Sequence, residues 1–278
     1  MTARWQTGTV ASGGEQIYYE VTGDDDLPAI MLTHGAGGTH AAWFQQVPPL
    51  AANGFRVITW DCRGFGNSTF TSGVHGSAAA VADMAAVLDA TGTPGAHLVG
   101  QSMGGWWVTA FTIAHPTRTH SLTLSNTVGG LWTTALLDYF REWTTKAAAN
   151  FGAAQRIGAH PAISPTFVER DPAHAFLYQQ LNTLHTPPMA AVGAALTGDA
   201  VAHNDLDATG VPVLVITSTD DDLFPPHLVI DTAQRLANAS IVEVAGAGHS
   251  TYFERPDLYN DALIAFIKKA TRERNGDG

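Results

Sequence analysis

The chain has 278 residues, of which 45% are hydrophobic and 14% are charged, and its formal net charge is −11. A chain of this length can bury a full core as one large domain or two small ones. The negative balance argues against a nucleic-acid partner, because neutralising phosphates requires clustered Lys and Arg.

Three further observations concern location and bonding. No run approaches 18 consecutive apolar residues, the first residues lack the apolar region of a secretory signal, and Cys62 is the single cysteine. We therefore expect a cytoplasmic protein with no membrane partner, no disulfide framework and no thiolate metal cluster.

The first half of the chain alternates predicted strands and helices. In chain order these are a hairpin over 8–23, a buried strand over 28–35, a helical turn or two within 41–54, a buried strand over 55–61, a helix over 78–92, a strand over 96–102, a helix from 103 to about 115 and a strand over 121–127. This alternation predicts a parallel sheet with helices on both faces.

The alternation is then interrupted. From about Gly129 to Asn204 the sequence is Ala-rich and mostly helical, without a clear strand. It resumes with a strand over 211–218, a helix over 226–239, a strand over 240–246 and a helix over 256–273. We therefore predict a core domain of residues 1–129 and 205–278, with a helical segment of residues 130–204 inserted at one edge of the sheet.

Ser102 is the candidate nucleophile. It stands in Gly100-Gln101-Ser102-Met103-Gly104, between a predicted strand and a predicted helix, which is the pattern of a nucleophile elbow. A Gly-rich turn with a purely structural role could have the same sequence. The assignment therefore depends on the strand predicted before Ser102 and the helix predicted after it. In such a tight turn the serine stands above the carboxyl edge of the sheet, beside the unpaired N–H groups of the new helix.

A base and an acid follow in the chain. His249 lies in a Gly-rich loop after the strand predicted over 240–246, where its imidazole can accept the serine proton and return it to a leaving group. Asp220, Asp221 and Asp222 follow the strand predicted over 211–218. One of these carboxylates is needed to hold the imidazole in the right tautomer, and the other two would form a solvated acidic turn.

A third loop at the same edge is built from small residues. Residues 33–40 read Thr-His-Gly-Ala-Gly-Gly-Thr-His and follow the strand predicted over 28–35. Small side chains let backbone N–H groups approach a reacting carbonyl oxygen. We expect the N–H groups of Ala36 and Met103 to form an oxyanion hole, in which the loss of one donor typically lowers the rate about 10²- to 10³-fold.

These residues resemble the α/β-hydrolase superfamily, and specifically its capped branch of small-molecule esterases, enol-lactonases and C–C hydrolases. The order Ser…Asp…His is the order of that family. The matching segments are residues 34–38, 61–68, 100–105, 218–226 and 246–256. The resemblance implies an eight-stranded, mostly parallel sheet flanked by helices, with a helical cap at about 130–204.

The resemblance also assigns roles to single residues. It implies Ser102 as nucleophile, His249 as base and, by matching Asp-x-x-x-Pro to residues 221–225, Asp221 as acid. This chain has Ser218 where the family usually has Gly, so Asp220 and Asp222 remain alternatives. Asp61 and Arg63 are implied to brace the loop beside the oxyanion hole.

The sequence therefore predicts a serine hydrolase that cleaves a carboxylic ester or lactone of a small, partly apolar molecule through an acyl-enzyme on Ser102, without a cofactor or metal ion. Trp43, Trp132, Phe224 and Tyr252 are expected to line an apolar substrate pocket.

Three alternatives use the same scaffold: a C–C bond hydrolase, a cofactor-free oxygenase or perhydrolase, and a ligand receptor that signals through its cap. Residues 249–253 lack the Trp that tends to follow the histidine in C–C hydrolases, which disfavours the first. An intact catalytic triad favours an enzyme over a ligand receptor.

Overall fold

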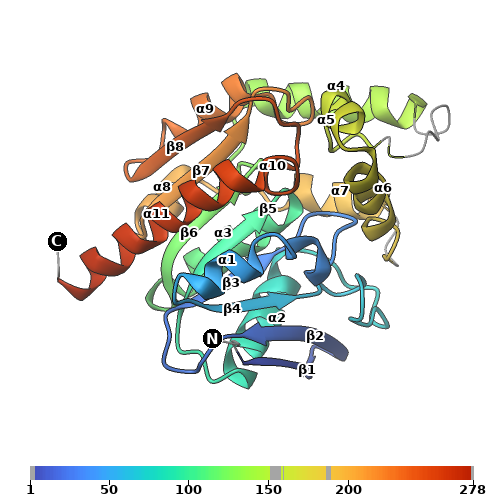
Figure 1. Ribbon diagram of the computed structural model, residues 1–278. Helices are drawn as coiled ribbons and strands as arrows, with labels where there is room; N and C mark the ends of the chain where they lie inside the picture. Colours follow the sequence, from blue (N-terminus) through green and yellow to red (C-terminus); the bar gives the residue numbers. More distant parts are fainter. Residues whose placement is uncertain (1–3, 151–157, 159, 186–188, 277–278) are drawn as a thin grey trace.

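The computed structural model describes residues 4–150, 158, 160–185 and 189–276 (Figure 1). The strands are β1 (Trp5–Ser12), β2 (Glu15–Thr22), β3 (Ala29–Thr33), β4 (Arg56–Trp60), β5 (Ala96–Gln101), β6 (Thr119–Ser125), β7 (Val213–Ser218) and β8 (Ala239–Val244). They form one sheet in the order β1-β2-β4-β3-β5-β6-β7-β8. β2 runs antiparallel to both β1 and β4, and the other neighbouring pairs of described strands are parallel, which confirms the eight-stranded, mostly parallel sheet.

Helices of the described residues connect these strands. They are η1 (His40–Trp43), α1 (Val47–Ala52), α2 (Ser77–Ala90), α3 (Met103–Ala114), η2 (Pro116–Arg118), α4 (Thr134–Asn150), α5 (Pro165–Arg170), α6 (Pro172–Leu181), α7 (Met189–Gly198), α8 (His203–Asp207), α9 (Pro226–Ala233), α10 (Thr251–Glu254) and α11 (Pro256–Asn275). None of these described helices combines the length and the apolar character that a membrane crossing would need.

The sheet is buried on both faces. Along β3, Ile30 and Leu32 point into a core cluster that includes residues of α1 and α11, whereas Met31 points into a second cluster that includes residues of α2, α3 and α9. This alternation follows from the two-residue period of a strand. It explains why the parallel strands are continuous apolar runs in the sequence.

The predicted helix over 226–239 is shorter in the structure. α9 ends at Ala233, and the N–H groups of Arg235 and Leu236 bond to carbonyls three residues earlier, in turns tighter than an α-helix. The chain must turn here because the N–H of Val213 on β7 already bonds to the carbonyl of Asn238, at the approach to β8.

The described part of the segment between β6 and β7 consists of helices joined by turns, with an isolated antiparallel bridge between His185 and Phe65. Figure 1 shows α4 along the top of the view and α5 to α7 down its right side, while α8 returns to the core and contacts α3. Residues 151–157, 159 and 186–188 of the predicted cap lie outside the described residues. Helices α4 and α6 contact the loops that follow β7 and β8: Tyr139 Oη donates to the carbonyl of Asp222 at 2.7 Å, and Tyr178 Oη accepts the hydroxyl of Ser250 at 2.7 Å. The insertion therefore meets the core at the carboxyl edge of the sheet.

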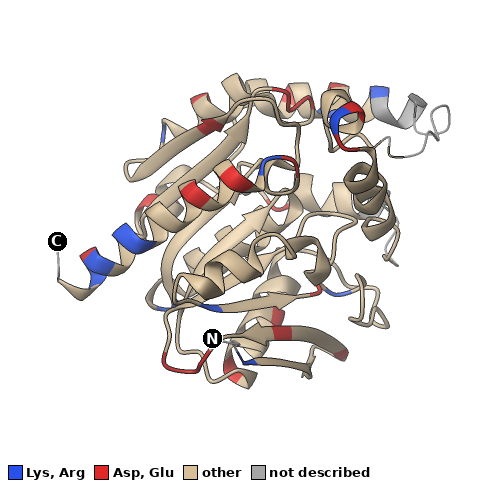
Figure 2. Ribbon diagram, viewed as in Figure 1, with Lys and Arg blue, Asp and Glu red and all other residues tan. Residues whose placement is uncertain are grey.

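Charges along α11 are ordered to suit the helix. Asp257 lies in its first turn, and Arg272 and Arg274 lie in its last turn. Figure 2 shows the same order, with acidic residues near the start of the helix and basic residues towards its end. Negative charge near the N-terminus and positive charge near the C-terminus both stabilise the helix dipole.

A buried ion pair fixes the loop after β4 to α2. The guanidinium of Arg63 donates to Asp83 through Nε at 2.8 Å and Nη2 at 2.7 Å. Both side chains are buried. The two parallel hydrogen bonds define the loop geometry as well as supplying attraction.

We predict that Asp83→Ala destabilises the fold by about 3–5 kcal/mol, because it leaves a buried guanidinium uncompensated. The matched control is Asp89→Ala, which removes the partner of Arg118 in an ion pair whose carboxylate is 68% exposed and which should cost at most about 1 kcal/mol. Urea unfolding of both variants measures the difference. Equal losses would contradict a special role for the buried pair.

Candidate active site

Ser102 occupies a strained corner of the backbone. β5 ends at Gln101 and α3 begins at Met103, so Ser102 alone connects strand to helix. Its φ is 49° and its ψ is −119°, a left-handed conformation that a residue with a side chain rarely adopts. Such a residue costs about 1–3 kcal/mol and is maintained by its surroundings. The corner is the geometry of a nucleophile elbow.

The glycines beside Ser102 are required by close packing. A Cβ atom on Gly100 would lie 2.5 Å from the carbonyl oxygen of Gly104. A Cβ atom on Gly104 would lie 2.5 Å from the carbonyl oxygen of Thr33, at the end of β3. The start of α3 is therefore pressed against two neighbouring strand ends, and a larger residue at either position would displace Ser102.

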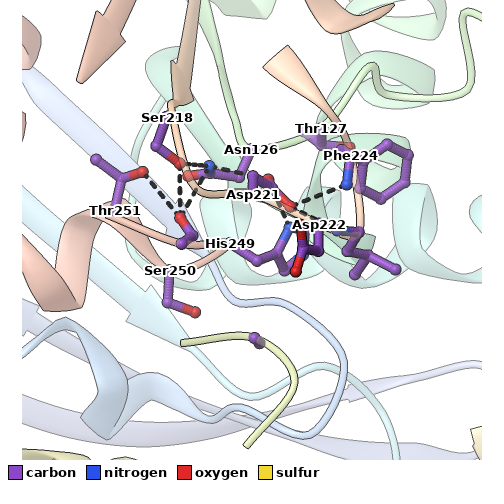
Figure 3. Close-up of polar contacts among 12 residues, drawn as sticks. Asn126, Thr127, Ser218, Asp221, Asp222, Phe224, His249, Ser250 and Thr251 are labelled. Carbon is purple, nitrogen blue, oxygen red and sulfur yellow. Dashed lines mark hydrogen bonds and ion pairs between the residues drawn. The ribbon is translucent and has the colours of Figure 1, made fainter. Parts of the chain in front are cut away.

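His249 and Asp221 form a buried pair beside this corner. Nδ1 of His249 donates to Oδ2 of Asp221 at 3.0 Å (Figure 3), and the two residues are 3% and 2% exposed. Oδ1 of Asp221 accepts the backbone N–H groups of Leu223 and Phe224, each at 2.9 Å. The carboxylate is thus fixed by its own loop and in turn orients the imidazole.

The other two aspartates point elsewhere. Asp220 is exposed and its carboxylate accepts the hydroxyl of Thr219 at 2.7 Å. Asp222 is also exposed, and its backbone carbonyl bonds to Tyr139. Of the three candidates, Asp221 is therefore the one that contacts His249.

Asn126 is a further member of the site that sequence reasoning missed. It lies at the end of β6, is fully buried and has a φ of 49°. Its Nδ2 group donates to Oδ2 of Asp221 at 3.1 Å and to the hydroxyl of Ser218 at 2.8 Å. The amide therefore supports the same carboxylate oxygen that binds His249.

Ser218, which departs from the family pattern, links two loops. The acid loop (residues 219–225) follows β7 and carries Asp221, and the histidine loop (residues 245–250) follows β8 and carries His249. The hydroxyl of Ser218 donates to the backbone carbonyl of Gly248 at 2.6 Å, and it accepts the amide of Asn126 (Figure 3). With Ser218 at this position, Asp221 still bonds to His249, and the hydroxyl adds a hydrogen bond to the residue before His249.

The residue before Ser102 is hydrogen-bonded to His249. Nε2 of Gln101, the residue before Ser102, donates to the carbonyl of His249 at 3.1 Å. Nε2 of His249 is buried and has no hydrogen-bond partner among the described residues, so it is free to accept the hydroxyl of Ser102. Hydrogen bonds between a nucleophile and its base often tighten only when substrate binds.

The predicted oxyanion loop lies against the same corner. A Cβ atom on Gly35 would lie 3.1 Å from Cβ of Ser102, which places the loop of Ala36 beside the nucleophile. Nδ1 of His34 donates to the carbonyl of Gly35 at 2.8 Å, and its Nε2 accepts the N–H of Cys62 at 3.0 Å. Burial lowers the pKa of His34, so a neutral imidazole holds the loop. Met103 is the first residue of α3, where the helix itself supplies no acceptor for the N–H.

Asp61 fixes the far end of this loop. Its carboxylate accepts the backbone N–H of His40 at 2.6 Å, Nδ1 of His40 at 2.8 Å and the N–H of Asn67 at 2.8 Å. Burial favours a higher pKa for Asp61, but these hydrogen bonds and the two neighbouring histidines outweigh it and lower the pKa. The carboxylate is therefore ionised and holds two loops together.

The four predicted pocket residues fall into two groups. The ring of Phe224 stacks on His249, with 5.6 Å between centroids, and Trp132 is 6.2 Å from Phe224. Trp43 and Tyr252 pack against each other at 4.6 Å, inside the core cluster that contains α11. The first pair adjoins His249, and contact of either pair with a substrate stays a prediction. Within the described residues, no group of three or more His, Cys, Asp or Glu could hold a metal ion.

Comparison with known proteins identifies the family. The family model described as alpha/beta hydrolase fold matches residues 28–256. The chain belongs to this family and is a hydrolase.

Relatives share nearly the whole length of the chain. It is 29% identical over 276 residues to a candidate carbamate hydrolase, RutD, of Caulobacter sp. (strain K31), covering 94% of this chain and 98% of that protein. It is 29% identical over 273 residues to a candidate non-heme bromoperoxidase, BpoC, of Mycobacterium tuberculosis (strain ATCC 25618 / H37Rv), covering 90% and 96%. A thermophilic esterase from Thermogutta terrifontis has the same fold, with a TM-score of 0.79, 24% identity and coverage of 95% and 99%.

We predict that Asp221→Asn lowers kcat by about 10⁴-fold, because an amide in this position favours the wrong imidazole tautomer. Asp220→Asn and Asp222→Asn are matched controls that change the same charge nearby, and each should stay within a few-fold of the parent. Steady-state hydrolysis of an aryl ester by the three variants provides the test. A larger loss in Asp222→Asn would show that the acid has been assigned to the wrong residue.

Proposed function

We propose that this protein is a serine hydrolase that cleaves a carboxylic ester or lactone of a small, partly apolar molecule through an acyl-enzyme on Ser102. The observation that carries this proposal is the buried Asp221–His249 pair, whose imidazole has an unbonded Nε2 beside the strained corner that bears Ser102. A nucleophile, a base and an acid that orients the base are the components of covalent acyl transfer.

In the proposed reaction, Nε2 of His249 takes the proton of Ser102 as Oγ attacks the substrate carbonyl carbon. The negative charge moves to the carbonyl oxygen, where the N–H groups of Ala36 and Met103 stabilise it. His249 then gives its proton to the leaving alkoxide, which departs as an alcohol. A water molecule, deprotonated by His249, then attacks the acyl carbon. As the bond to Oγ breaks, His249 returns the proton to Oγ, which releases the carboxylic acid and restores Ser102.

The surroundings of Asp221 suit this cycle. Its carboxylate accepts hydrogen bonds from Leu223, Phe224, Asn126 and His249. These donors hold the carboxylate against the imidazole, so that it can stabilise the imidazolium formed during each step.

We further propose that residues 130–204 act as a cap that excludes water from the reacting groups. Support comes from aromatic contacts across the junction, where Trp132 and Phe140 of the insertion lie 6.2 and 5.5 Å from Phe224, which stacks on His249. An apolar cover next to the base strengthens the electrostatic interactions inside the site.

The substrate class can be tested with a panel of compounds. We expect turnover of p-nitrophenyl esters of short acids and of simple lactones, and little turnover of vinylogous keto acids from ring fission. The similarity to RutD and BpoC makes aryl carbamates and a carboxylic acid with hydrogen peroxide useful additional arms. Turnover confined to keto acids or to peroxide would overturn the ester assignment, and tight binding without any turnover would indicate a receptor.

We predict that Ser102→Ala abolishes hydrolysis and covalent labelling by a fluorophosphonate while leaving the fold intact, because only the attacking oxygen is removed. Ser240→Ala, at an exposed position of β8, is the matched control and should behave like the parent. Gel fluorescence and circular dichroism measure labelling and folding. Labelling that persists in Ser102→Ala would place the nucleophile elsewhere.

A further inference from the structure

The two residues that flank His249 are both connected to the helical insertion. Ser250, on one side, donates its hydroxyl to Oη of Tyr178 on α6 at 2.7 Å. Gly248, on the other side, donates its N–H to Oε1 of Glu254 at 3.0 Å. The second carboxylate oxygen of Glu254 binds Ser164 of the insertion directly.

Glu254 bridges the insertion and the histidine loop. Its Oε2 accepts the backbone N–H of Ser164 at 3.1 Å and the hydroxyl of Ser164 at 2.8 Å. Ser164 is the N-cap residue of α5. In addition, Nη2 of Arg170 on α5 donates to the backbone carbonyl of Glu254 at 3.0 Å. One carboxylate thus joins the start of α5 to the residue before His249.

The bridge is buried and lacks a counter-ion. Glu254 is 3% exposed, and in the described residues its carboxylate forms no ion pair with Lys, Arg or His. Burial raises the pKa of Glu254, opposed by the hydrogen bonds from Gly248 and Ser164. Burying a carboxyl group without a counter-ion costs stability, and this carboxyl group lies between the insertion and the loop that carries His249.

The junction is also sterically tight. A Cβ atom on Gly248 would lie 2.7 Å from the backbone nitrogen of Ser164, so the two backbones are in direct contact. The carbonyl of Gly248 meanwhile accepts the hydroxyl of Ser218 at 2.6 Å. The backbone just before His249 is therefore held on one side by the acid loop and on the other by the insertion, through Glu254.

We propose that Glu254 is a positioning residue that couples the docked insertion to the orientation of His249. Its effect on turnover rests on the proposed function, in which His249 is the base. With Glu254 bound to Ser164, the loop of residues 248–250 presents the imidazole to Asp221 and Ser102. Without that bond, the loop loses its anchor to α5.

The first test compares Glu254→Gln with the parent. The amide keeps the size of the side chain, but it has one accepting oxygen in place of two. Either Gly248 or Ser164 therefore loses its hydrogen-bond acceptor. We expect kcat to fall about 10- to 100-fold, as misplacement of a reacting group does, with KM within about twofold. Glu169→Gln, an exposed position on α5, is the matched control and should match the parent.

A second readout does not require turnover. The Nδ1 proton of His249, bonded to Asp221, should give a slowly exchanging downfield proton NMR signal in the parent. We expect this signal to broaden or disappear in Glu254→Gln while the melting temperature shows that the chain is folded. Failure of the parent to hydrolyse any ester would overturn the proposed function, whereas the NMR signal would still test the coupling.

Milder variants decide the outcome if Glu254→Gln does not fold. Ser164→Ala removes one donor to Glu254, and Tyr178→Phe removes the acceptor of Ser250. Each should lower kcat several-fold while the protein stays folded, and Ser164→Ala should also lower the melting temperature slightly because it removes the N-cap of α5. If Glu254→Gln folds, adding Ser164→Ala to it should cause little further loss, because both changes break the same connection. Independent, multiplicative losses, or an unchanged kcat and NMR signal in folded variants, would overturn the proposal.

Discussion

The strained backbone at Ser102 is the constraint on which the rest of the site depends. A residue with a φ of 49° is stable only if its neighbours hold it, and here the N–H of Ser102 bonds to the carbonyl of Ser125 on β6 at 3.0 Å. The sheet therefore extends its hydrogen bonding into the corner itself. The close approach of Gly104 to β3 prevents the corner from relaxing.

The same kind of strain recurs one strand away. Among the described residues, Ser102 and Asn126 are the two non-glycine residues with a positive φ, and they follow directly on β5 and β6, which are parallel neighbours. Ser102 turns towards the proposed substrate site, whereas Asn126 turns towards Asp221. Backbone strain tends to gather at functional sites, and the two corners help to align the proposed nucleophile and acid along one edge of the sheet. On this account, the insertion completes the alignment by holding the loop of His249.

Local patterns made much of this predictable from sequence. The elbow could be predicted because its glycines are demanded by contacts within a few residues, and the sheet because parallel strands buried on both faces are continuous apolar runs. His249 and the three aspartates could be placed at the carboxyl edge because each follows such a run. The choice of Asp221 from the residues alone needed the turn geometry that only the structure gives.

Other features depend on contacts between distant parts of the chain. Asn126 donates a hydrogen bond to Asp221, which lies 95 residues later in the sequence. A single Asn after a strand has no sequence pattern that distinguishes it from an ordinary strand end. Glu254 and Ser164 are 90 residues apart, and their bond requires that α5 docks on the histidine loop. Trp43 and Tyr252 were chosen as aromatic residues near the site, but sequence could not show that they pack against each other in the core.

The central claim is that Ser102 carries the acyl group during turnover. The most direct measurement is rapid acid quench of the reaction with a p-nitrophenyl ester, followed by mass spectrometry of the digested protein. We expect the acyl mass to appear on the peptide containing Ser102 within the first turnover and to disappear as substrate is exhausted. An acyl group on a different residue, or product formed at full rate without any acylated peptide, would show that Ser102 does not carry the acyl group.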